Sequence, residues 1–362
     1  MKIFRKIINR IKLNLTSINK VKVKDIAVFA RQFHAMLNAG VTLIHCLNIL
    51  GQQTENLILR EAIEKIYEDV QKGFALSDAM GKHRDIFPEL FINMVDAGEV
   101  SGNLDTIMDR MASHYEKEAK LQTKIRDAAI YPIILALVSS AVVVFMLTAI
   151  LPSFVNMFES SGVNLPVPTL VLLRISNGLR QHWYFFIIVL FVVILIVDKY
   201  ANTDIGKKKL DELKLRVPIL RNTIIIISAS RFARTLSILL SSGIPLLTAM
   251  DIISKVIGNR VLSDGLLNVK EDLRKGFDLS GSVQRLNLLP PMVNAMIRIG
   301  EESGSLDEIM KKTADFYDYE VEAAMQRLTA LLEPLMIIIM AVIIGFLIIA
   351  MYLPMIDMIK TI

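Results

Sequence analysis

Two long stretches without a charged side chain constrain what this chain can fold into more than any other feature. Residues 128–158, 31 in succession, contain no Asp, Glu, Lys or Arg, and residues 334–356 contain none either. Each stretch is long enough to cross about 30 Å of hydrocarbon as a helix that rises 1.5 Å per residue. We therefore predict transmembrane helices over residues 128–152 and 334–354.

A third apolar stretch is shorter. Thirteen of the 15 residues from 183 to 197 are Phe, Ile, Leu or Val. Each contributes about −0.3 to −0.6 kcal/mol to membrane insertion, so the sum is roughly −4 to −8 kcal/mol. Trp183, Tyr184 and Tyr200 flank the stretch as residues of a membrane interface do. We predict a transmembrane helix over residues 183–200, and a buried core helix is the alternative.

The distribution of basic residues predicts the topology. Residues 1–127 carry 19 Lys and Arg, residues 198–333 carry another 19, and residues 152–182 carry two. Basic segments stay on the cytoplasmic side of a membrane. We therefore expect a cytoplasmic N-terminus, an extracytoplasmic loop over residues 153–182 and an extracytoplasmic C-terminal tail over residues 355–362.

The first 24 residues form a basic N-terminal arm, with eight Lys and Arg and no acidic residue. They lack the apolar run of a cleavable signal peptide. Phe4, Ile8, Ile11 and Leu15 fall on one face of a helix, which suits a helix lying on a membrane surface. A partly ordered arm explains the same composition equally well, so both interpretations stay open.

The chain contains an internal duplication. At an offset of 203 residues, Phe29-Ala30-Arg31 matches Phe232-Ala233-Arg234, and Gly40 matches Gly243. After a slip of one residue the match continues with Gly98-Glu99 and Ser101-Gly102, which align with Gly300-Glu301 and Ser303-Gly304, and with Pro132, which aligns with Pro334. A match held over more than 120 residues indicates duplication.

Each copy has the periodicity of helices. Phe29 and Phe33 recur at i and i+4, Phe232 and Leu236 repeat this spacing, and Gly40 and Gly243 fit residues that end a helix. We predict an all-α integral membrane protein with two duplicated cytoplasmic helical bundles and three transmembrane helices. The bundles are expected over residues 25–127 and 201–333, each leading directly into a membrane helix.

The repeated Gly-Glu-x-Ser-Gly sequences at 98–102 and 300–304 are too polar to be membrane dimerisation motifs. We interpret each as a helix stop, a tight turn and a new helix start. A loop that docks a partner is the sharper alternative, because loops held by rigid helices often carry function.

Motifs of catalysis and of cofactor or metal binding are missing from the sequence. It contains no P-loop, no Gly-x-Ser-x-Gly elbow and no His-Glu-x-x-His. The single cysteine, Cys46, excludes an internal disulfide. We expect its neighbour His45 to be a packed or interfacial residue rather than a catalytic one. We therefore expect no enzyme activity, no catalytic residues, no cofactor and no metal. A net charge of +5 is too mild to indicate direct nucleic-acid binding.

These features together resemble the type II secretion F protein family (GspF/PilC), which includes inner-membrane platform proteins of type IV pili. The resemblance covers about residues 25–356. It rests on the duplicated Phe-Ala-Arg and Gly-Glu-x-Ser-Gly motifs and on Tyr131-Pro132 and Glu333-Pro334, which stand at the entrances of two membrane helices. The residues that carry it, as family signatures or candidate partner contacts, are Phe29, Arg31, Gly40, Gly98, Glu99, Gly102, Pro132, Phe232, Arg234, Gly243, Gly300, Glu301, Gly304, Glu333 and Pro334.

The resemblance implies a non-enzymatic scaffold in the bacterial cytoplasmic (inner) membrane that couples a hexameric assembly ATPase to pilin or pseudopilin assembly. The implied partners are this ATPase, the pilin or pseudopilin subunits, other inner-membrane assembly proteins, membrane lipid and further copies of the chain. Pilus, secretion and DNA-uptake systems all remain open. An oligomeric membrane transporter or channel is the alternative, although the uncharged membrane stretches lack the ionisable groups that transport usually needs.

Overall fold

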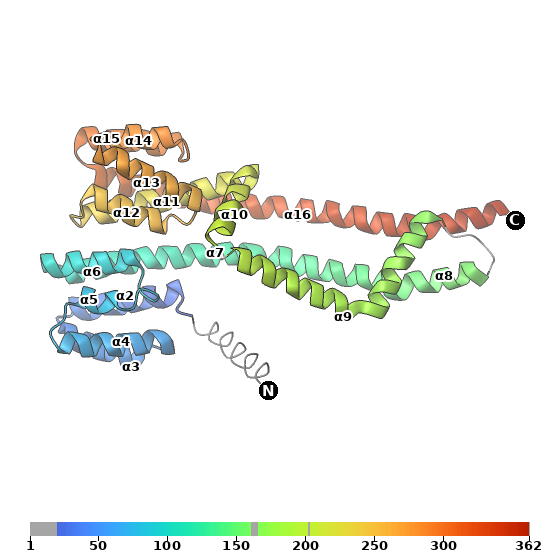
Figure 1. Ribbon diagram of the computed structural model, residues 1–362, viewed down its shortest axis with the longest axis horizontal. Coiled ribbons are helices and arrows are strands. Elements are labelled where there is room, and N and C mark those ends of the chain that lie inside the picture. Colours follow the sequence, from blue (N-terminus) through green and yellow to red (C-terminus); the bar gives the residue numbers. More distant parts are fainter. Residues whose placement is uncertain (1–19, 161–165, 202, 362) are drawn as a thin grey trace. The chain divides into compact units, whose positions relative to one another are not determined.

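The structure confirms the all-α class. The computed structural model describes residues 20–160, 166–201 and 203–361, and every regular element within these ranges is a helix (Figure 1). Most of the predicted N-terminal arm, residues 1–19, lies outside the described residues. The first described helix, α2, begins at Val23.

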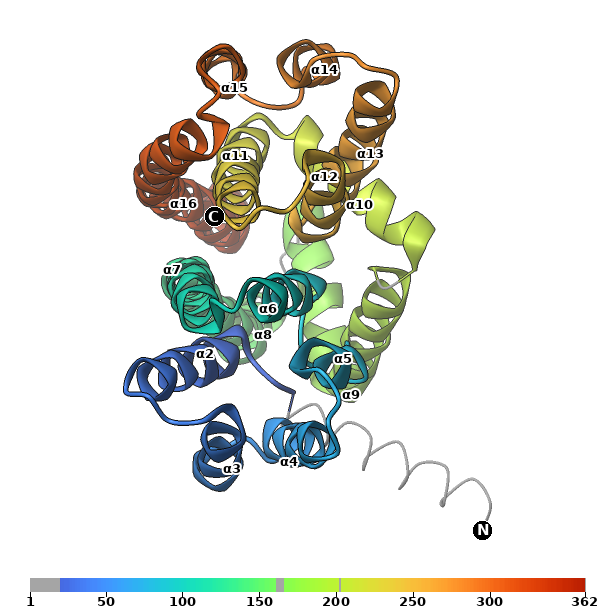
Figure 2. The ribbon, with the colours of Figure 1, turned by 90° about the vertical axis from the view of Figure 1, so that its left-hand side faces the viewer.

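The two copies contain the same succession of helices. The first copy consists of α2 (Val23–Asn38), α3 (Leu43–Gln53), α4 (Leu57–Gln71), α5 (Leu76–Gly81), α6 (Glu89–Ser101) and the start of α7 (Leu104–Phe145). The second consists of α11 (Pro218–Ser241), α12 (Leu246–Val256), α13 (Arg260–Arg274), α14 (Leu279–Leu286), α15 (Pro291–Ser303) and the start of α16 (Leu306–Thr361). Both sets of helices are labelled in Figure 2. The predicted duplication is therefore confirmed at the level of helices.

Each copy has its own apolar core, built from the residues whose spacing predicted it. Phe29 and Phe33 are buried, and the Phe29 ring packs 5.5 Å from Phe87 and 6.1 Å from Phe91, centroid to centroid. In the second copy, Phe232 is fully buried at the position equivalent to Phe29. Burial of such side chains contributes about 1.5–3 kcal/mol each, which gives each helix set its cohesion.

The described residues fall into two compact units, which are divided after Lys124, Arg221 and Val321. The first unit holds the helical parts of both copies, and the second holds the apolar parts of α7 and α16 with the segment between the copies. Both α7 and α16 pass from one unit to the other as continuous helices. Pro132 and Pro334 lie inside these helices rather than at their starts.

Two of the expected membrane helices are confirmed as helices of suitable length and composition. Leu104–Val155 and Leu306–Pro354 contain apolar windows with mean hydropathies of 2.8 and 3.0, of which only 6% and 11% are buried by the protein. Apolar surface left uncovered in this way is suited to lipid. The chain is therefore a membrane protein.

Among the residues that the structure describes, the third helix that meets the same criteria is Leu220–Ser241, and several side chains of the expected stretch at 183–200 lie outside the described ones. However, 61% of the apolar window of Leu220–Ser241 is buried inside the protein. Burial, rather than lipid, therefore accounts for its apolar character. Residues 183–200 belong to α9 (Val167–Ala201), where Phe185, Phe191 and Ile196 are exposed. A membrane span at 183–200 remains a prediction.

Residues 153–182, expected as an extracytoplasmic loop, contain helices, and their extracytoplasmic placement remains a prediction. The expected loop is largely helical: a π-helix at Met146–Ile150 leads into α8 (Leu151–Ser160), and α9 begins at Val167 and bends at His182. A small apolar cluster explains why this segment folds. It contains Leu147, Leu151, Val155, Leu172, Leu347, Ala350 and Met351. The segment's apolar residues pack on α16 instead of extending into solvent. The next helix after α9 is α10 (Asp204–Arg216).

Hydroxyl groups on α9 reinforce this cluster. Thr169 Oγ1 donates a hydrogen bond to the Ala350 carbonyl of α16, and Ser176 Oγ donates one to the Leu147 carbonyl in the π-helix. All of these groups are buried. At the other end, α16 continues as a helix to Thr361, so the expected tail is helical up to that residue. Its extracytoplasmic placement remains a prediction.

Candidate functional site

The two Gly-Glu-x-Ser-Gly motifs are helix stops, as predicted. Gly102 follows α6 with φ of 71°, and Gly304 follows α15 with φ of 65°. Both conformations are left-handed, which glycine adopts without strain. In the first motif the Gly102 amide donates to the Glu99 carbonyl and the Asn103 amide donates to the Gly98 carbonyl, so the last carbonyls of the helix are satisfied.

The glutamates of these motifs have a role that the sequence did not reveal. Leu76 and Ser77 are the first two residues of α5. The Glu99 carboxylate accepts hydrogen bonds from their backbone amides at 2.6 and 2.8 Å. In the second copy the Glu301 carboxylate accepts from the first two amides of α14 at 2.7 and 3.0 Å. A carboxylate at a helix N-terminus satisfies unpaired amides and the helix dipole. Both glutamates are thus capping residues supplied by another helix.

A signal for this pairing was present in the sequence. Leu76-Ser77 matches Leu279-Ser280 between the copies, just as Glu99 matches Glu301. A glutamate and a Leu-Ser pair that keep a similar distance along the sequence in both copies are the pattern expected of side chains and backbone groups in contact. The separation of about 22 residues hides the contact from any reasoning that considers local motifs alone.

The first glycine of each motif allows two helices to approach closely. A Cβ atom on Gly98 would lie 2.9 Å from Ile107 Cγ1, and one on Gly300 would lie 2.9 Å from Leu306 Cα. Real Cβ atoms do not approach other atoms this closely. Gly98 and Gly300 therefore set the angle at which α6 meets α7 and α15 meets α16.

The signature arginines tie the first helix of each copy to its long helix. Arg31 Nε lies 2.7 Å from Glu116 Oε1, and its Nη1 lies 2.7 Å from Asp109 Oδ1. The pairing with Arg31 holds the pKa of Glu116 below its usual value. In the second copy Arg234 pairs with Asp318 and lies 3.1 Å from Asp315 Oδ1. Asp318 is the residue equivalent to Glu116, so the duplication preserves the ion pair.

A second tie lies one helical turn from the first. His34 Nδ1 donates to the Asp105 carbonyl at 3.0 Å, and Ser237 Oγ, at the equivalent position, donates to the Asp307 carbonyl at 2.8 Å. The side chains differ, but the contact is retained. Each long helix is thus joined to the first helix of its bundle at two points along its polar, N-terminal part.

The remaining predicted signature residues end helices or join the two long helices. Gly40 and Gly243 end α2 and α11 with φ of 81° and 78°, as predicted. Glu333 Oε1 accepts a hydrogen bond of 3.4 Å from the Tyr131 hydroxyl. Tyr131 and Glu333 occupy equivalent positions, so corresponding points of the two long helices meet there.

The two copies meet in the first unit through polar contacts. Lys117 of α7 lies 3.2 Å from Asp315 and 3.4 Å from Asp318 of α16. Arg231 of α11 donates to Glu118 of α7, with 3.2 Å between Nε and Oε2. Arg110 of α7 donates to the Ser241 and Ser242 hydroxyls at 3.0 and 2.6 Å. We call this set of contacts the junction.

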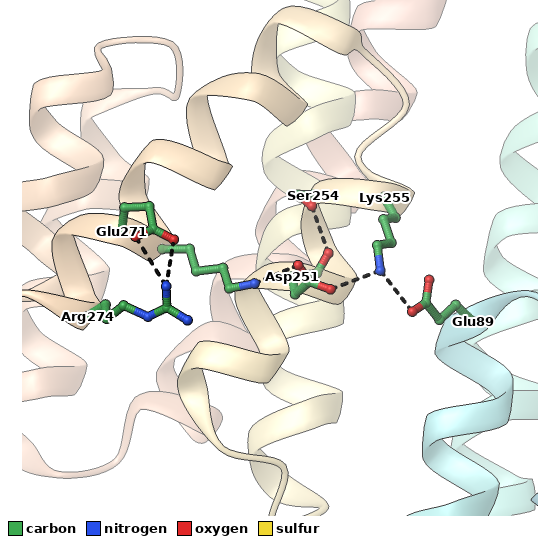
Figure 3. Close-up of polar contacts among 7 residues, drawn as sticks. Glu89, Asp251, Ser254, Lys255, Glu271 and Arg274 are labelled. Carbon is green, nitrogen blue, oxygen red and sulfur yellow. Dashed lines mark hydrogen bonds and ion pairs between the residues drawn. The ribbon is translucent and has the colours of Figure 1, made fainter.

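Lys255 extends the junction to α12 and α6. Its ammonium group lies 2.8 Å from Glu89 Oε1 of the first copy and 2.9 Å from Asp251 Oδ2 (Figure 3). Lys270 binds the other Asp251 oxygen at 2.7 Å. The pKa of Lys255 is raised, mainly by its hydrogen bond to Glu89 and secondly by the one to Asp251. The pKa of Asp251 is lowered, mainly by its hydrogen bond from Lys270 and secondly by the one from Lys255. Glu271 and Arg274, also drawn in Figure 3, pair within α13.

A cavity of about 560 Å³ lies within the junction, lined by α7, α11 and α16. His114 borders it, and its Nδ1 is buried without a hydrogen-bond partner. The pKa of His114 is lowered to about 4, and burial is the main cause. Nearby Arg234 and Arg231 also lower it, whereas Glu118 and Asp318 raise it in part. The imidazole is therefore neutral at physiological pH.

The described residues contain no group of three or more His, Cys, Asp or Glu side chains placed to hold a metal ion. Cys46 is buried, and burial raises the pKa of its thiol. His45, expected to be packed or interfacial, is exposed in the single chain, so it is not packed in the core. A thiol that is both buried and protonated is poorly suited to nucleophilic catalysis.

Comparison with known proteins explains why the copies share these contacts. The family described as type II secretion system (T2SS), protein F matches residues 29–152 and again residues 232–354. The chain belongs to the type II secretion system protein F family. Each match begins at the signature phenylalanine, Phe29 or Phe232, and extends into the apolar part of the long helix. The T2SS protein F unit therefore includes the bundle together with its apolar helix.

Individual members of the T2SS protein F family match nearly the whole chain. The type IV pilus assembly protein PilC of Thermus thermophilus is 41% identical over 340 residues, which cover 94% of this chain and 84% of the relative. PilC of Pseudomonas aeruginosa is 36% identical, with 92% and 90% covered. The type II secretion system protein F of Aeromonas hydrophila is 31% identical, with 92% and 86% covered.

Proposed function

We propose that this protein is an inner-membrane platform protein of a type IV pilus or type II secretion-like machine. In this role it couples a cytoplasmic assembly ATPase to the assembly of pilin or pseudopilin subunits. The observation that carries the proposal is the family match, which covers both copies and continues into both apolar helices. Relatives of each kind, named for pilus assembly and for secretion, match at similar coverage, so the proposal names both systems.

The geometry supports a mechanical role. In each copy an arginine and a second hydrogen bond fix the first helix to the long helix, and that helix then continues unbroken into the apolar segment. A displacement of the bundle therefore moves the membrane segment without requiring a catalytic group. We infer that the protein itself is not an enzyme.

Its proposed placement follows from the basic residues of the sequence. With 19 Lys and Arg in each large polar segment and two between residues 152 and 182, both bundles and the N-terminus face the cytoplasm. The C-terminus is then extracytoplasmic, provided that residues 183–200 cross the membrane. Accessibility of single cysteines to a membrane-impermeant reagent tests this topology directly.

The test of the proposal is purification of the tagged full-length protein from its native membrane after mild crosslinking, followed by mass spectrometry. Recovery of a P-loop ATPase together with single-span, pilin-like proteins supports the platform role and names the fibre system. Recovery of neither, in a preparation that retains other membrane complexes, overturns it.

We further propose that the basic arm, residues 1–24, and the first bundle supply much of the contact with the ATPase. The arm carries eight positive charges, so its contribution should weaken as salt is added. Deleting residues 1–24 is expected to lower ATPase binding and to flatten its salt dependence. Unchanged binding with an unchanged salt dependence would show that the arm has no such role.

A transporter or channel is the competing function. The stretch from 128 to 158 carries no Asp, Glu, Lys, Arg or His, whereas transport pathways through lipid usually retain such a residue. Ion flux through vesicles that contain only the purified protein would favour the transporter. The platform role predicts no flux above that of empty vesicles.

A further inference from the structure

The cavity in the junction is large enough to hold a small molecule. Its volume of about 560 Å³ falls within the range of roughly 300–1,000 Å³ that small-molecule sites occupy. One face of each of α7, α11 and α16 forms its wall. Ile238 and Ala314 are the apolar residues of the lining, and the other lining residues carry a charge, a hydroxyl group or an imidazole. The cavity is therefore suited to a polar ligand rather than to an apolar one.

A reversal of charge between the two copies faces this cavity. In the first copy Asp109 binds Arg31, with 2.7 Å between Oδ1 and Nη1. The equivalent residues of the second copy are Lys311 and Arg234, so a lysine stands where the first copy supplies a carboxylate. Arg234 still donates through Nη2 to two aspartates of α16, but its Nε is buried without a hydrogen-bond partner. The second copy thus lacks an anion that the first copy provides from its own sequence.

Further donors at the cavity are not neutralised. Lys311 forms no ion pair within the described part of the chain, and Arg110 donates to the hydroxyls of Ser241 and Ser242 rather than to a carboxylate. The Nδ1 atom of His114 is buried without a partner as well. Buried groups of this kind normally find a hydrogen-bond partner, in the protein or in a bound molecule.

The acidic residues of the lining do not cancel these positive charges. Three of the four, Asp109, Glu308 and Asp315, are each bonded to a basic side chain. Only the fourth, Asp307, forms no ion pair among the residues described. Two cations of the lining, Arg110 and Lys311, therefore stand against one unpaired carboxylate, and an excess of positive charge remains.

We propose that this cavity binds a phosphate group, which supplies the anion that the second copy lacks. Arg234 Nε, Lys311 and Arg110 are the donors, because guanidinium and ammonium groups together suit the oxygens of a phosphate. Lys311 and Arg234 belong to the second copy and Arg110 to the first, so the bound phosphate joins the two copies.

The rest of the lining indicates what the phosphate is attached to. A bare phosphate leaves most of the cavity to water, whereas Asp307 and the serines of the lining can bond to hydroxyl groups. Apart from the His114 ring, the described lining contains no aromatic side chain on which a nucleobase could stack. The ligand class that fits best is therefore a phosphate ester of a hydroxylated molecule, such as a sugar phosphate.

The test is isothermal titration calorimetry of the purified full-length protein, with glucose 6-phosphate, inorganic phosphate and glucose as separate probes. The expected result is saturable binding of glucose 6-phosphate at one site per chain, without binding of glucose. Tighter binding of glucose 6-phosphate than of inorganic phosphate assigns the site to an ester, and equal affinities assign it to free phosphate. No saturable binding of either phosphate probe, or equal binding of glucose, overturns the proposal.

Lys311→Gln locates the binding site. Lys311 is exposed and forms no ion pair within the described residues, so the substitution is expected to leave the fold intact while it lowers the affinity for glucose 6-phosphate at least fivefold. Lys275→Gln is the matched control, because it makes the same change of charge at an exposed residue of the second copy, at the end of α13 and outside the cavity. Equal affinities of the two variants would exclude the cavity as the site.

Arg110→Gln tests whether the ligand is held by both copies. It is also expected to lower the affinity at least fivefold, and melting of the unliganded variant shows whether the loss of its bonds to the serines has disturbed the fold. A ligand that binds only the folded state raises the melting temperature, so glucose 6-phosphate should raise that of the wild type more than that of Lys311→Gln or Arg110→Gln. Wild-type affinity in Arg110→Gln would contradict the placement between the copies. These readouts involve neither the ATPase nor pilins, so they fail or succeed independently of the proposed function.

Discussion

At the residue scale, Glu99 and Glu301 show how a charged signature residue can serve the fold rather than a reaction. Glu99→Gln and Glu301→Gln are each expected to destabilise the protein by about 1–2 kcal/mol, because each helix start loses a charged acceptor for two amides. Thermal unfolding of the purified protein measures the effect. Glu302→Gln is the control, since Glu302 is exposed and adjacent in sequence to Glu301. Equal melting of all three variants would refute the capping role.

His114 makes a prediction about pH at the same scale. Its pKa is lowered from 6.5 to about 4 in the folded state, so between these values the unfolded chain binds more protons than the folded one. Stability therefore falls as pH drops from 6.5 towards 4. The ring is partly accessible to solvent, so we expect a loss of about 2 kcal/mol rather than the full effect of the shift.

The variant His114→Phe tests this prediction, because Phe316 occupies the equivalent position in the second copy. It is expected to remove this part of the pH dependence, measured as denaturant midpoints between pH 4 and 6.5. His45→Gln, at an exposed position, serves as the control. An unchanged slope in His114→Phe would assign the pH dependence to other groups.

At the element scale, the crossing of α6 with α7 and of α15 with α16 depends on one glycine each. Gly98→Val and Gly300→Val are expected to lower the melting temperature, with Gly300→Val the more severe. At Gly300 the added Cβ would lie 2.9 Å from the backbone atom Leu306 Cα, whereas at Gly98 the nearest backbone atom, Leu104 Cα, would be 3.3 Å away. Gly81→Ala is the control, because no atom lies within 4 Å of its added Cβ. Unaltered melting of Gly300→Val would contradict the close approach.

Helices and their ends could be predicted from local sequence. The i, i+4 spacing of Phe29 and Phe33 identified a buried face, and Gly40 and Gly243 identified left-handed helix ends. The helices at 151–160 and 167–182 were missed because their apolar residues are covered by α16, some 180 residues away in sequence. An apolar stretch at 220–241 was not considered as a span, and its burial in the second copy shows why hydropathy alone does not identify membrane helices.

At the scale of the whole molecule, the signature residues were identifiable but their partners were not. Duplication marked Arg31 and Arg234, yet the pairing with Glu116 and Asp318 spans more than 80 positions. The junction was still less accessible, because pairs such as Glu89 with Lys255 occur once and leave no repeat in the sequence. Internal repeats therefore predict contacts within a copy, whereas contacts between copies depend on residues in which the copies differ.

The last prediction concerns the long helix as a mechanical link and rests on the proposed platform role. Three glycines inserted after Gln122, near the boundary between the two units at Lys124, are expected to interrupt α7, since glycine costs about 1 kcal/mol relative to alanine in a helix. Seven alanines inserted at the same point instead keep the helix stiff. They add close to two turns, so the faces beyond the insertion stay within about 20° of their original direction.

If the stiff helix transmits displacement, the glycine variant should lose fibre assembly at least tenfold while retaining membrane insertion, and the alanine variant should retain more activity. The same three glycines placed after Thr54, in the connection between α3 and α4, should have little effect. Equal activity of the two α7 variants would mean that α7 acts only as a membrane anchor. The force would then have to pass through α16, whose Arg234 tie provides the equivalent route.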